Sequence, residues 1–290
     1  MQPFDIKILS ATHKRYSMPE DEMYIPLQVN CYANGHFDEP RFQYDDVGDN
    51  ISAKNPYYCE LTALYWGWKN LDCDYLGLVH YRRYLVGDKK PARNGKDVRE
   101  KERPEGEKAR SEDVRADRKL EMVLTGSQAQ DLLDVLAKQG IYVVLPVKRN
   151  YYIETLFSHY AHSHHETDLL VTSRVIFEFF PEYAEAFTEV MKRHRSHMFN
   201  MCIMRKDLLD AYCTWLFDVL GKVEERLDIS WYTDFDKRVY GRLSELLLDV
   251  WLTRNDIMYH ELPMTNLEGE NWLRKIPRFI RRKIIPEHRK

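Results

Sequence analysis

The chain has 290 residues, of which 44% are hydrophobic, so it can bury a core of its own. Its five cysteines are scattered and include no CxxC pair, which argues against a disulfide framework and favours a reducing compartment. The apolar stretch at the start is interrupted by Asp5 and Lys7, so we expect no signal peptide. No run approaches the roughly 20 apolar residues that cross a bilayer.

The formal net charge of −3 conceals an asymmetry between the body and the end of the chain. Residues 272–290 carry a net +7, which leaves −10 on residues 1–271. The large apolar side chains of this end include Trp272, Ile276, Phe279, Ile280 and Ile284. They share one arc of a helix, which predicts that residues 266–290 form a basic amphipathic tail on an anionic membrane. Because Pro277 and Lys283 interrupt the pattern, docking on the protein's own body is the alternative. We expect no nucleic-acid partner.

The first half of the chain predicts the beginning of an open sheet. Residues 4–12 are apolar and β-branched and run into a polar loop, which is typical of a first strand. Residues 60–70 repeat apolar side chains at helical spacing, and residues 74–85 form an apolar run that becomes cationic at its end. A helix followed by a strand is the αβ step of a parallel sheet.

Residues 88–119 differ from the sequence around them, because 21 of these 32 residues are charged. Such a segment buries too little apolar area to offset the entropy of ordering it. We expect a mobile charged insertion. A solvated helix is the alternative, although two prolines and two glycines oppose a continuous one.

Helix and strand patterns continue to alternate through the second half. The expected helices are 127–140, 181–194, 206–227 and one around 239–250, and the expected strands are 141–146, 197–205 and 256–263. These patterns predict a single α/β domain over residues 1–265, with additional helices toward the C-terminus.

His80, Arg82 and Arg83 stand at the carboxyl end of a predicted strand, the edge where open α/β sheets bind ligands. Two adjacent guanidinium groups match the oxygens of a diphosphate, and the imidazole can add a hydrogen bond. The alternative is a strand end that reaches water, with both arginines in surface ion pairs. Upstream, residues 45–60 gather Asp and Asn around Gly48. These residue types suit ribose hydroxyls and base edges, but they also suit a plain turn.

Four histidines, His159, His162, His164 and His165, stand close to Asp168. They invite a metal interpretation, but there is no HExxH pattern and no thiolate at metal-ligand spacing. We expect no metal here and interpret the segment as a polar loop or helix that lines a cleft. The acidic residues near such elements are Asp168, Asp234, Asp236 and Glu245, and a general base must come from this kind of group or from histidine. Glu245 lies opposite the apolar stripe of its helix, so its side chain faces either solvent or the wall of a cleft.

Several of these segments together resemble one family. They are DDVGDNISAKNPYYCELTALYWGWKN, DYLGLVHYRRYL, YYIETLFSHYAHSHHETDL, NMCIM with the helix after it, and RVYGRLSELLLDVWL. From about Asp5 to Pro263 the chain resembles the bacterial family of domains of unknown function numbered 4422, which is associated with capsular and exopolysaccharide glycosyltransferases. It departs from the family pattern at Cys202, at Leu246 and in the length of the charged insertion.

The resemblance implies a GT-A-like fold, a single Rossmann-type nucleotide-binding domain. It further implies transfer of a hexose, galactofuranose or galactose, from a UDP-sugar to a lipid-linked oligosaccharide in capsular or exopolysaccharide biosynthesis, with inversion. The protein would be cytoplasmic and peripheral at the inner face of the cytoplasmic membrane. A non-catalytic membrane-associated scaffold of a polysaccharide assembly complex is the second hypothesis, and a metal-dependent hydrolase built on the histidines is the third.

The resemblance also implies roles for individual residues. Many GT-A enzymes hold a divalent metal with a DxD motif where this chain has HYRRY. We therefore expect no cofactor and neutralisation of the diphosphate by His80, Arg82 and Arg83, with Mn or Mg as the alternative. The remaining donor-side residues are Thr12, His13, Lys14, Asp49, Asn50, Asn55 and Glu60. The acceptor-side residues are His159, His162 and Asn200. The expected catalytic base is Asp236, followed by Asp168 and Glu245.

Overall fold

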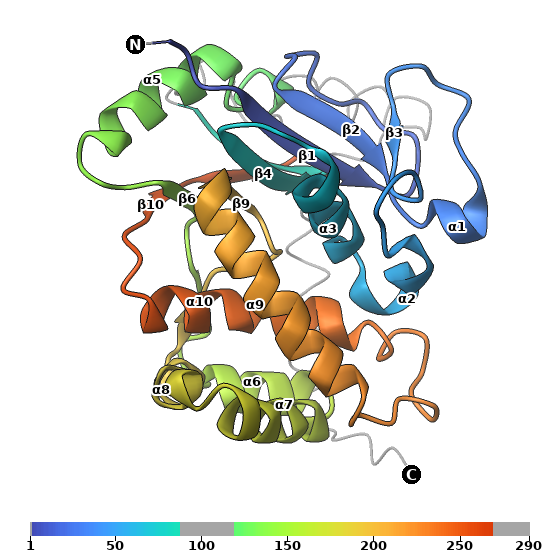
Figure 1. Ribbon diagram of the computed structural model, residues 1–290, viewed down its shortest axis with the longest axis vertical. Helices are drawn as coiled ribbons and strands as arrows, with labels where there is room; N and C mark the ends of the chain where they lie inside the picture. Colours follow the sequence, from blue (N-terminus) through green and yellow to red (C-terminus); the bar gives the residue numbers. More distant parts are fainter. Residues whose placement is uncertain (1, 88–118, 269–290) are drawn as a thin grey trace, which may run out of the picture.

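A nine-stranded sheet forms the centre of the computed structural model, which describes residues 2–87 and 119–268 (Figure 1). Seven strands lie in the order β10-β6-β9-β4-β1-β2-β3. They are β1 (Ile6–Thr12), β2 (Tyr24–Gln28), β3 (Gln43–Tyr44), β4 (Tyr75–His80), β6 (Val143–Pro146), β9 (Cys202–Arg205) and β10 (His260–Leu262). The other two, β5 (Arg83–Leu85) and β11 (Met264–Asn266), pair with each other, and β5 also pairs with β4.

Strand direction determines where a site can form. β1 is parallel to β2 and β4, β2 is parallel to β3, and β6 is parallel to β10. Within this row of seven strands, only β9 is antiparallel to its neighbours, which are β4 and β6. The carboxyl ends of β1, β2, β4 and β6 therefore meet at one edge of the sheet, the edge where α/β sheets bind ligands. Gly77 allows β9 to approach β4 closely, since a Cβ there would lie 2.9 Å from the Cys202 carbonyl oxygen.

Helices cover both faces of the sheet and form a further layer below it (Figure 1). The helices are α1 (Cys31–Asn34), α2 (Asn55–Tyr58), α3 (Leu61–Asn70), α5 (Gly126–Ala137), α6 (Leu156–Ser163), α7 (Glu166–Phe179), α8 (Ala184–Lys192), α9 (Lys206–Glu224) and α10 (Val239–Arg254), with 3-10 turns η1 (Ser52–Lys54) and η2 (Pro181–Tyr183). A small ribbon pairs β7 (Arg149–Asn150) with β8 (Arg195–Ser196). Among the described residues, no helix combines the length and apolarity needed to cross a bilayer.

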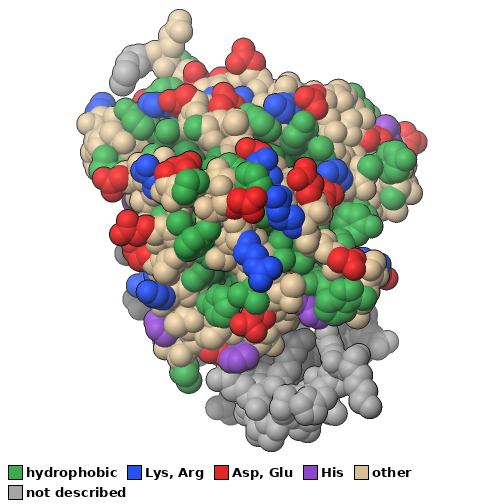
Figure 2. Space-filling model, turned by 60° about the horizontal axis from the view of Figure 1, so that its bottom comes forward, with side chains coloured by type: hydrophobic (Ala, Val, Ile, Leu, Met, Phe, Trp, Pro, Cys, Tyr) green, Lys and Arg blue, Asp and Glu red, His purple; other side chains and the backbone are tan. Residues whose placement is uncertain are grey.

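Each face of the sheet carries an apolar core. Side chains of α3, α9 and α10 share the larger core with alternate residues of β1 and β4, while α5 packs on the opposite face. The predicted α/β class, with a mostly parallel sheet and additional C-terminal helices, is confirmed. Acidic and basic side chains are interspersed over the face that Figure 2 shows.

The structure corrects two sequence predictions. The run 74–85 is a hairpin, in which β4 turns at Tyr81 and Arg82 into β5. The strand expected at 197–205 begins only at Cys202, because Phe199 and Asn200 adopt positive φ angles of 74° and 53° that interrupt extended backbone. The histidine segment, expected to be a polar loop or helix, is helical and forms the end of α6 and the start of α7. The predicted insertion, apart from Lys119, and the tail beyond Glu268 lie outside the described residues.

A buried carboxylate, Asp45, holds the loops at the carboxyl edge together. It follows β3 and is fully buried. Its oxygens accept hydrogen bonds from the backbone N–H groups of Asn30 and Cys31 at 3.0 and 3.1 Å. They also accept from the hydroxyls of Ser52 at 2.5 Å and Thr62 at 2.7 Å. One side chain thereby connects the start of α1, the η1 turn and α3.

Asp45→Asn should therefore destabilise the fold by about 3 kcal/mol, because an amide N–H would face a donor at a buried site. Urea denaturation of the purified protein measures this change. Asp46→Asn is the matched control, since the neighbouring Asp46 pairs with a half-exposed His36 on the surface, and the substitution should cost less than about 1 kcal/mol. Equal losses in the two variants would contradict the role of Asp45.

Candidate active site

Four polar side chains from distant parts of the chain converge at the carboxyl end of β4. We call Glu60, His80, Asn200 and Glu245 the polar cluster. Glu60 immediately precedes α3, His80 ends β4, Asn200 lies just before β9, and Glu245 stands on α10. All four were predicted site residues, but sequence reasoning had divided them among donor, acceptor and catalytic roles. The structure brings them together.

Asn200 links the elements that meet at the polar cluster. Its amide nitrogen donates to Glu60 Oε1 at 2.8 Å and to the Gly241 carbonyl at 3.0 Å, and its amide oxygen accepts from the Ser244 hydroxyl at 2.8 Å. A Cβ on Gly241 would lie 3.1 Å from the Cys59 Cβ, so the glycine lets α10 approach the start of α3. The left-handed backbone at Asn200 is tolerated by asparagine better than by most residues.

His80 is held as a neutral donor. Its Nε2 lies 2.6 Å from the Phe199 carbonyl oxygen and 4.0 Å from Glu60 Oε1. Burial lowers the pKa of His80 below its ordinary value, despite the opposing effect of Glu60. Because the carbonyl can only accept, the imidazole carries its proton on Nε2 at neutral pH.

Glu245 has the strongly perturbed carboxyl group of the polar cluster. Burial, with repulsion from Glu60, raises its pKa to about 8, while the Phe199 N–H and the cations Arg83 and Arg149 oppose the shift. The side chain is partly buried, so it is neither sealed in the interior nor fully solvated. A carboxyl group shifted toward neutral pH by burial and a like charge, at the ligand-binding edge of a sheet, is a candidate acid–base residue.

A cationic pair lies beside the polar cluster, at the end of β1. Lys14 Nζ and Arg82 Nη1 approach the same carboxylate, that of Glu268, at 3.5 and 2.7 Å. Thr12 orders the loop, because its hydroxyl donates to the Lys14 carbonyl at 2.5 Å. Next to them, the pKa of His13 is lowered by burial and by the surrounding cations. Arg83 points elsewhere, with its guanidinium 4.3 Å from the centre of the Phe199 ring. The two arginines therefore do not form one fork.

The predicted donor residues Asp49, Asn50 and Asn55 are engaged in local structure. Asp49 accepts from Tyr65 at 3.1 Å, and its backbone N–H donates to Asn70 at the far end of α3. Ten residues of helix, about 15 Å, separate that end from the polar cluster. Asn50 donates to carbonyls of its own loop, and Asn55 donates to the Cys59 carbonyl and to Thr62. Their geometry supports loop and helix packing.

The two carboxylates ranked first as the base lie in the interior. Asp168 is 1% exposed and accepts from the phenols of Tyr160 at 2.8 Å and Tyr232 at 2.6 Å. Burial raises its pKa against the effect of these hydrogen bonds. Asp236 is 2% exposed, accepts from Thr233 at 2.6 Å, and has His165 Nε2 at 3.6 Å. Both carboxylates are already bonded to protein groups.

The histidines expected on the acceptor side are split. His159 and His162 both lie within 3.0 Å of Glu154 and lower the pKa of that carboxyl group. The ring of His159 also packs on Tyr151, at 4.0 Å between centroids. Asn200 belongs instead to the polar cluster. His159 and His162 therefore stabilise the start of α6, next to the polar cluster but outside it.

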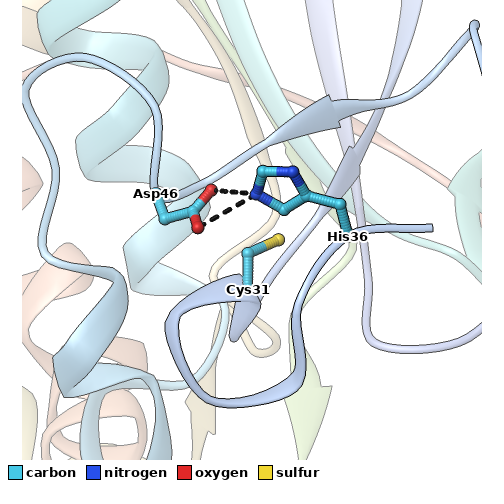
Figure 3. Close-up of side chains that lie close together, drawn as sticks. All are labelled: Cys31, His36 and Asp46. Carbon is cyan, nitrogen blue, oxygen red and sulfur yellow. Dashed lines mark hydrogen bonds and ion pairs between the residues drawn. The ribbon is translucent and has the colours of Figure 1, made fainter. Parts of the chain in front are cut away.

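Cys31, His36 and Asp46 form the group of potential metal ligands found among the described residues (Figure 3). Their ligand atoms lie within 4.8 Å of one another. His36 Nε2 is paired with Asp46 at 2.7 Å, and the Cys31 thiol donates to the Gln28 carbonyl at 3.2 Å. Burial raises the pKa of Cys31 to about 12. Because a metal needs the thiolate, this arrangement fits a neutral thiol beside an ion pair better than a metal centre.

Sequence reasoning missed several residues that shape the site. Arg149 and Tyr151 lie close enough to Glu245 to act on it electrostatically, although both follow β6 about 95 residues earlier. Arg238 donates from Nε to the Cys59 thiol at 3.1 Å and also influences His13. The basic pair Lys148–Arg149 after a buried strand was the one available sequence pattern, since it repeats the arrangement at the end of β4.

Comparison with known proteins agrees with this architecture. Residues 7–256 match the family described as Domain of unknown function (DUF4422). The chain belongs to the DUF4422 family. Among solved structures, this DUF4422 chain is similar to the apo structure of the WbbM bifunctional glycosyltransferase, with a TM-score of 0.73 and 28% sequence identity. The similarity covers 92% of this chain and 46% of the WbbM chain, so it spans about half of that protein. No curated protein sequence matches the chain.

Replacing Asn200 should separate its side-chain bonds from its backbone strain. Asn200→Gly and Asn200→Ala both remove three hydrogen bonds and should each lower the free energy of unfolding by about 2 kcal/mol or more. Alanine should cost about 1 kcal/mol beyond glycine, because φ at this position is +53°. Chemical denaturation of both variants tests the order, and an alanine variant as stable as wild type would contradict it.

The raised pKa of Glu245 predicts a pH-dependent stability. The folded state keeps a proton that the unfolded state releases, so stability is retained below about pH 4.5 and is lost as the pH rises to about 8. Glu245→Gln mimics the protonated form and should gain on wild type over this range, by an amount on the order of 3 kcal/mol. Denaturant titrations at intervals from pH 4.5 to 9 measure the difference, and a difference independent of pH would exclude the shift.

Proposed function

We propose that this protein is an inverting glycosyltransferase that takes a UDP-sugar donor, with Glu245 as its general base. The observation that carries the proposal is the placement of Glu245, whose pKa is raised to about 8, at the carboxyl edge of the sheet, where the cations Lys14 and Arg82 also converge. Membership of the DUF4422 family and similarity to a glycosyltransferase structure support it.

Lys14 and Arg82 supply the donor side. Because both cations approach one carboxylate, they already form an anion-binding pair that fits the oxygens of a diphosphate. Thr12 ends β1, and His13 follows it in the loop that holds Lys14. As the bond between the anomeric carbon and the phosphate oxygen breaks, these groups would stabilise the charge on the leaving UDP. The proposal requires no metal, and the notable trio of potential ligands at α1 fits an ion pair and a thiol better.

Glu245 supplies the base. The acceptor hydroxyl would attack the anomeric carbon and form the new glycosidic bond while its proton moves to the Glu245 carboxylate. Glu245 suits this role better than Asp168 or Asp236, because those carboxylates are 1% and 2% exposed and accept hydrogen bonds from protein hydroxyls. The neutral His80 and the amide of Asn200 fix Glu60 and the Phe199 loop around it.

The proposal extends to the sugar, the acceptor and the cellular location, which follow from the family resemblance. The sugar is galactose or galactofuranose, and the acceptor is a lipid-linked oligosaccharide in capsular or exopolysaccharide synthesis. The protein works at the inner face of the cytoplasmic membrane. The basic residues 272–290 supply the attraction to an anionic surface. A non-catalytic scaffold of the same assembly complex is the competing function, and it would lack both UDP binding and turnover.

The decisive experiment is a donor screen of the full chain that follows UDP release with and without saccharide acceptors. We expect UDP to bind by calorimetry and at least one UDP-sugar to be turned over, with the rate unaffected by EDTA. Absence of UDP binding and of turnover for every donor would overturn the enzyme assignment. Turnover abolished by EDTA and restored by Mn or Mg would overturn the cationic mechanism while leaving the transferase intact.

Glu245→Gln should lower kcat by at least about 100-fold with little change in UDP affinity, because the amide cannot accept the proton. The wild-type kcat/KM should rise with pH and level off above about pH 8, and this rise should disappear from the residual activity of the variant. Asp168→Asn is the matched control, with kcat expected within about tenfold of wild type in the folded fraction. A full loss in Asp168→Asn beside a near-normal Glu245→Gln would refute the assignment.

Glu268→Gln should lower the KM for the UDP-sugar by roughly two- to fivefold, because Lys14 and Arg82 would no longer be paired with a carboxylate. Lys14→Ala should raise the same KM. Initial rates at varied donor concentration test both changes. If Glu268→Gln raised the KM, the carboxylate would be orienting the cations rather than competing for them.

A further inference from the structure

A second group of polar side chains lies along α10. It contains two buried nitrogen atoms that have no hydrogen-bond partner within residues 2–87 and 119–268. They are Nδ1 of His164 and Nη1 of Arg242. An oxygen of Asp236 lies 3.9 Å from Arg242 Nη1, which is too far for a hydrogen bond. A buried polar atom without a partner costs about 1–3 kcal/mol, so two in one place require an explanation.

The electrostatics show that both groups are desolvated without full compensation. Burial, with the nearby Arg242 charge, lowers the pKa of His164 to about 3, so its imidazole is neutral. Burial also lowers the pKa of Arg242 below its ordinary value. The carboxyl groups of Asp168 and Asp236 lie around the guanidinium, so the group has no excess positive charge. This balance favours a neutral, hydroxyl-rich ligand over an anion.

Two exposed aromatic rings border the same group. In the segment between α9 and α10, Trp231 is 61% exposed and Phe235 is 55% exposed. The Phe235 ring lies 4.3 Å from the Arg242 guanidinium and 6.4 Å, between centroids, from His164. Trp231 meets His165 at 4.8 Å. Exposed ring faces beside a few hydrogen-bonding groups are the composition of a small-ligand site, and the C–H face and hydroxyls of a sugar match it.

This second group of side chains lies next to the polar cluster. Arg242 stands one turn after Arg238 and three residues before Glu245, so the three side chains share a face of α10. Arg238 donates to the Cys59 thiol beside Glu60, and Arg242 and Cys59 lie close enough to shift each other's pKa. The aromatic rings and unpaired nitrogen atoms therefore adjoin the site of the proposed base.

The geometry points to an acceptor subsite. We infer that a neutral sugar unit of the saccharide acceptor stacks on Phe235 and Trp231, and that its hydroxyls bond to His164 Nδ1 and Arg242 Nη1. This inference rests on the proposed glycosyltransferase function and assigns its acceptor side to residues other than His159 and His162. Binding a neutral sugar would satisfy the two nitrogen atoms and leave the charge of the site unchanged.

The test separates saccharide binding from UDP binding in the full-length protein. Saturation-transfer difference NMR with octyl glycosides of galactose, glucose, mannose and N-acetylglucosamine reports the acceptor side, and calorimetry with UDP reports the donor side. We expect Trp231→Ala and Phe235→Ala to weaken binding of the preferred glycoside at least tenfold while UDP affinity stays within twofold. Both rings are exposed, so neither variant should unfold. Phe177→Ala is the matched control, because this 54% exposed ring lies on α7, outside the group.

Each outcome has a distinct meaning. If UDP binds but no glycoside gives a signal, or if the two variants bind the preferred glycoside as wild type does, the subsite is overturned and the proposed transferase is not. If Phe177→Ala weakens binding as much as the two variants, the assignment also fails. If the variants lose glycoside binding while wild type does not bind UDP, the saccharide site stands and the UDP-dependent function falls.

Discussion

The site depends on the hydrogen bonds that the side-chain amide of Asn200 makes. It joins the start of α3, through Glu60, to α10, through Gly241 and Ser244. This link fixes the orientation of polar side chains between the sheet edge and α10, which apolar contacts alone would not do. The left-handed backbone of Phe199 and Asn200 turns a carbonyl toward His80 and ends the strand early. Local strain is thus placed where several chain segments must meet, as is common at functional sites.

One face of α10 places two ionisable side chains in different environments. Burial and the charge of Glu60 raise the pKa of Glu245 to about 8. Three residues earlier, Arg242 lies among the carboxyl groups of Asp168 and Asp236, and its Nη1 has no hydrogen-bond partner within the described part of the chain. In the proposed transferase the carboxyl group would exchange a proton and the guanidinium would bind hydroxyls, and the helix holds both within two turns.

The polar groups at the end of β1 and in the loops before α3 are paired in two different ways. Lys14 and Arg82 converge on Glu268, so one carboxylate neutralises only part of their charge until a stronger anion competes. Asp45, by contrast, is fully bonded and inaccessible, and it fixes the loops that precede α3. Buried carboxylates with every oxygen satisfied organise the scaffold, whereas those with a remaining bonding capacity face the edge of the sheet.

The sequence by itself determined the α/β class, buried helices such as 60–70 and 206–227, and buried strands such as 141–146, because periodicity and local composition encode these features. It also named all four members of the polar cluster, though not their association. Only the tertiary structure distinguished the three candidate carboxylates. Asp236, Asp168 and Glu245 are all acidic residues, and the sequence does not show how deeply each is buried. In the folded protein, packing buries Asp236 and Asp168 and leaves Glu245 partly exposed beside the like charge of Glu60. Likewise, Asp49 and Asn50 looked like ligand contacts until α3 placed them at its far end. Burial and long-range juxtaposition set these roles, and neither is a property of neighbouring residues in the chain.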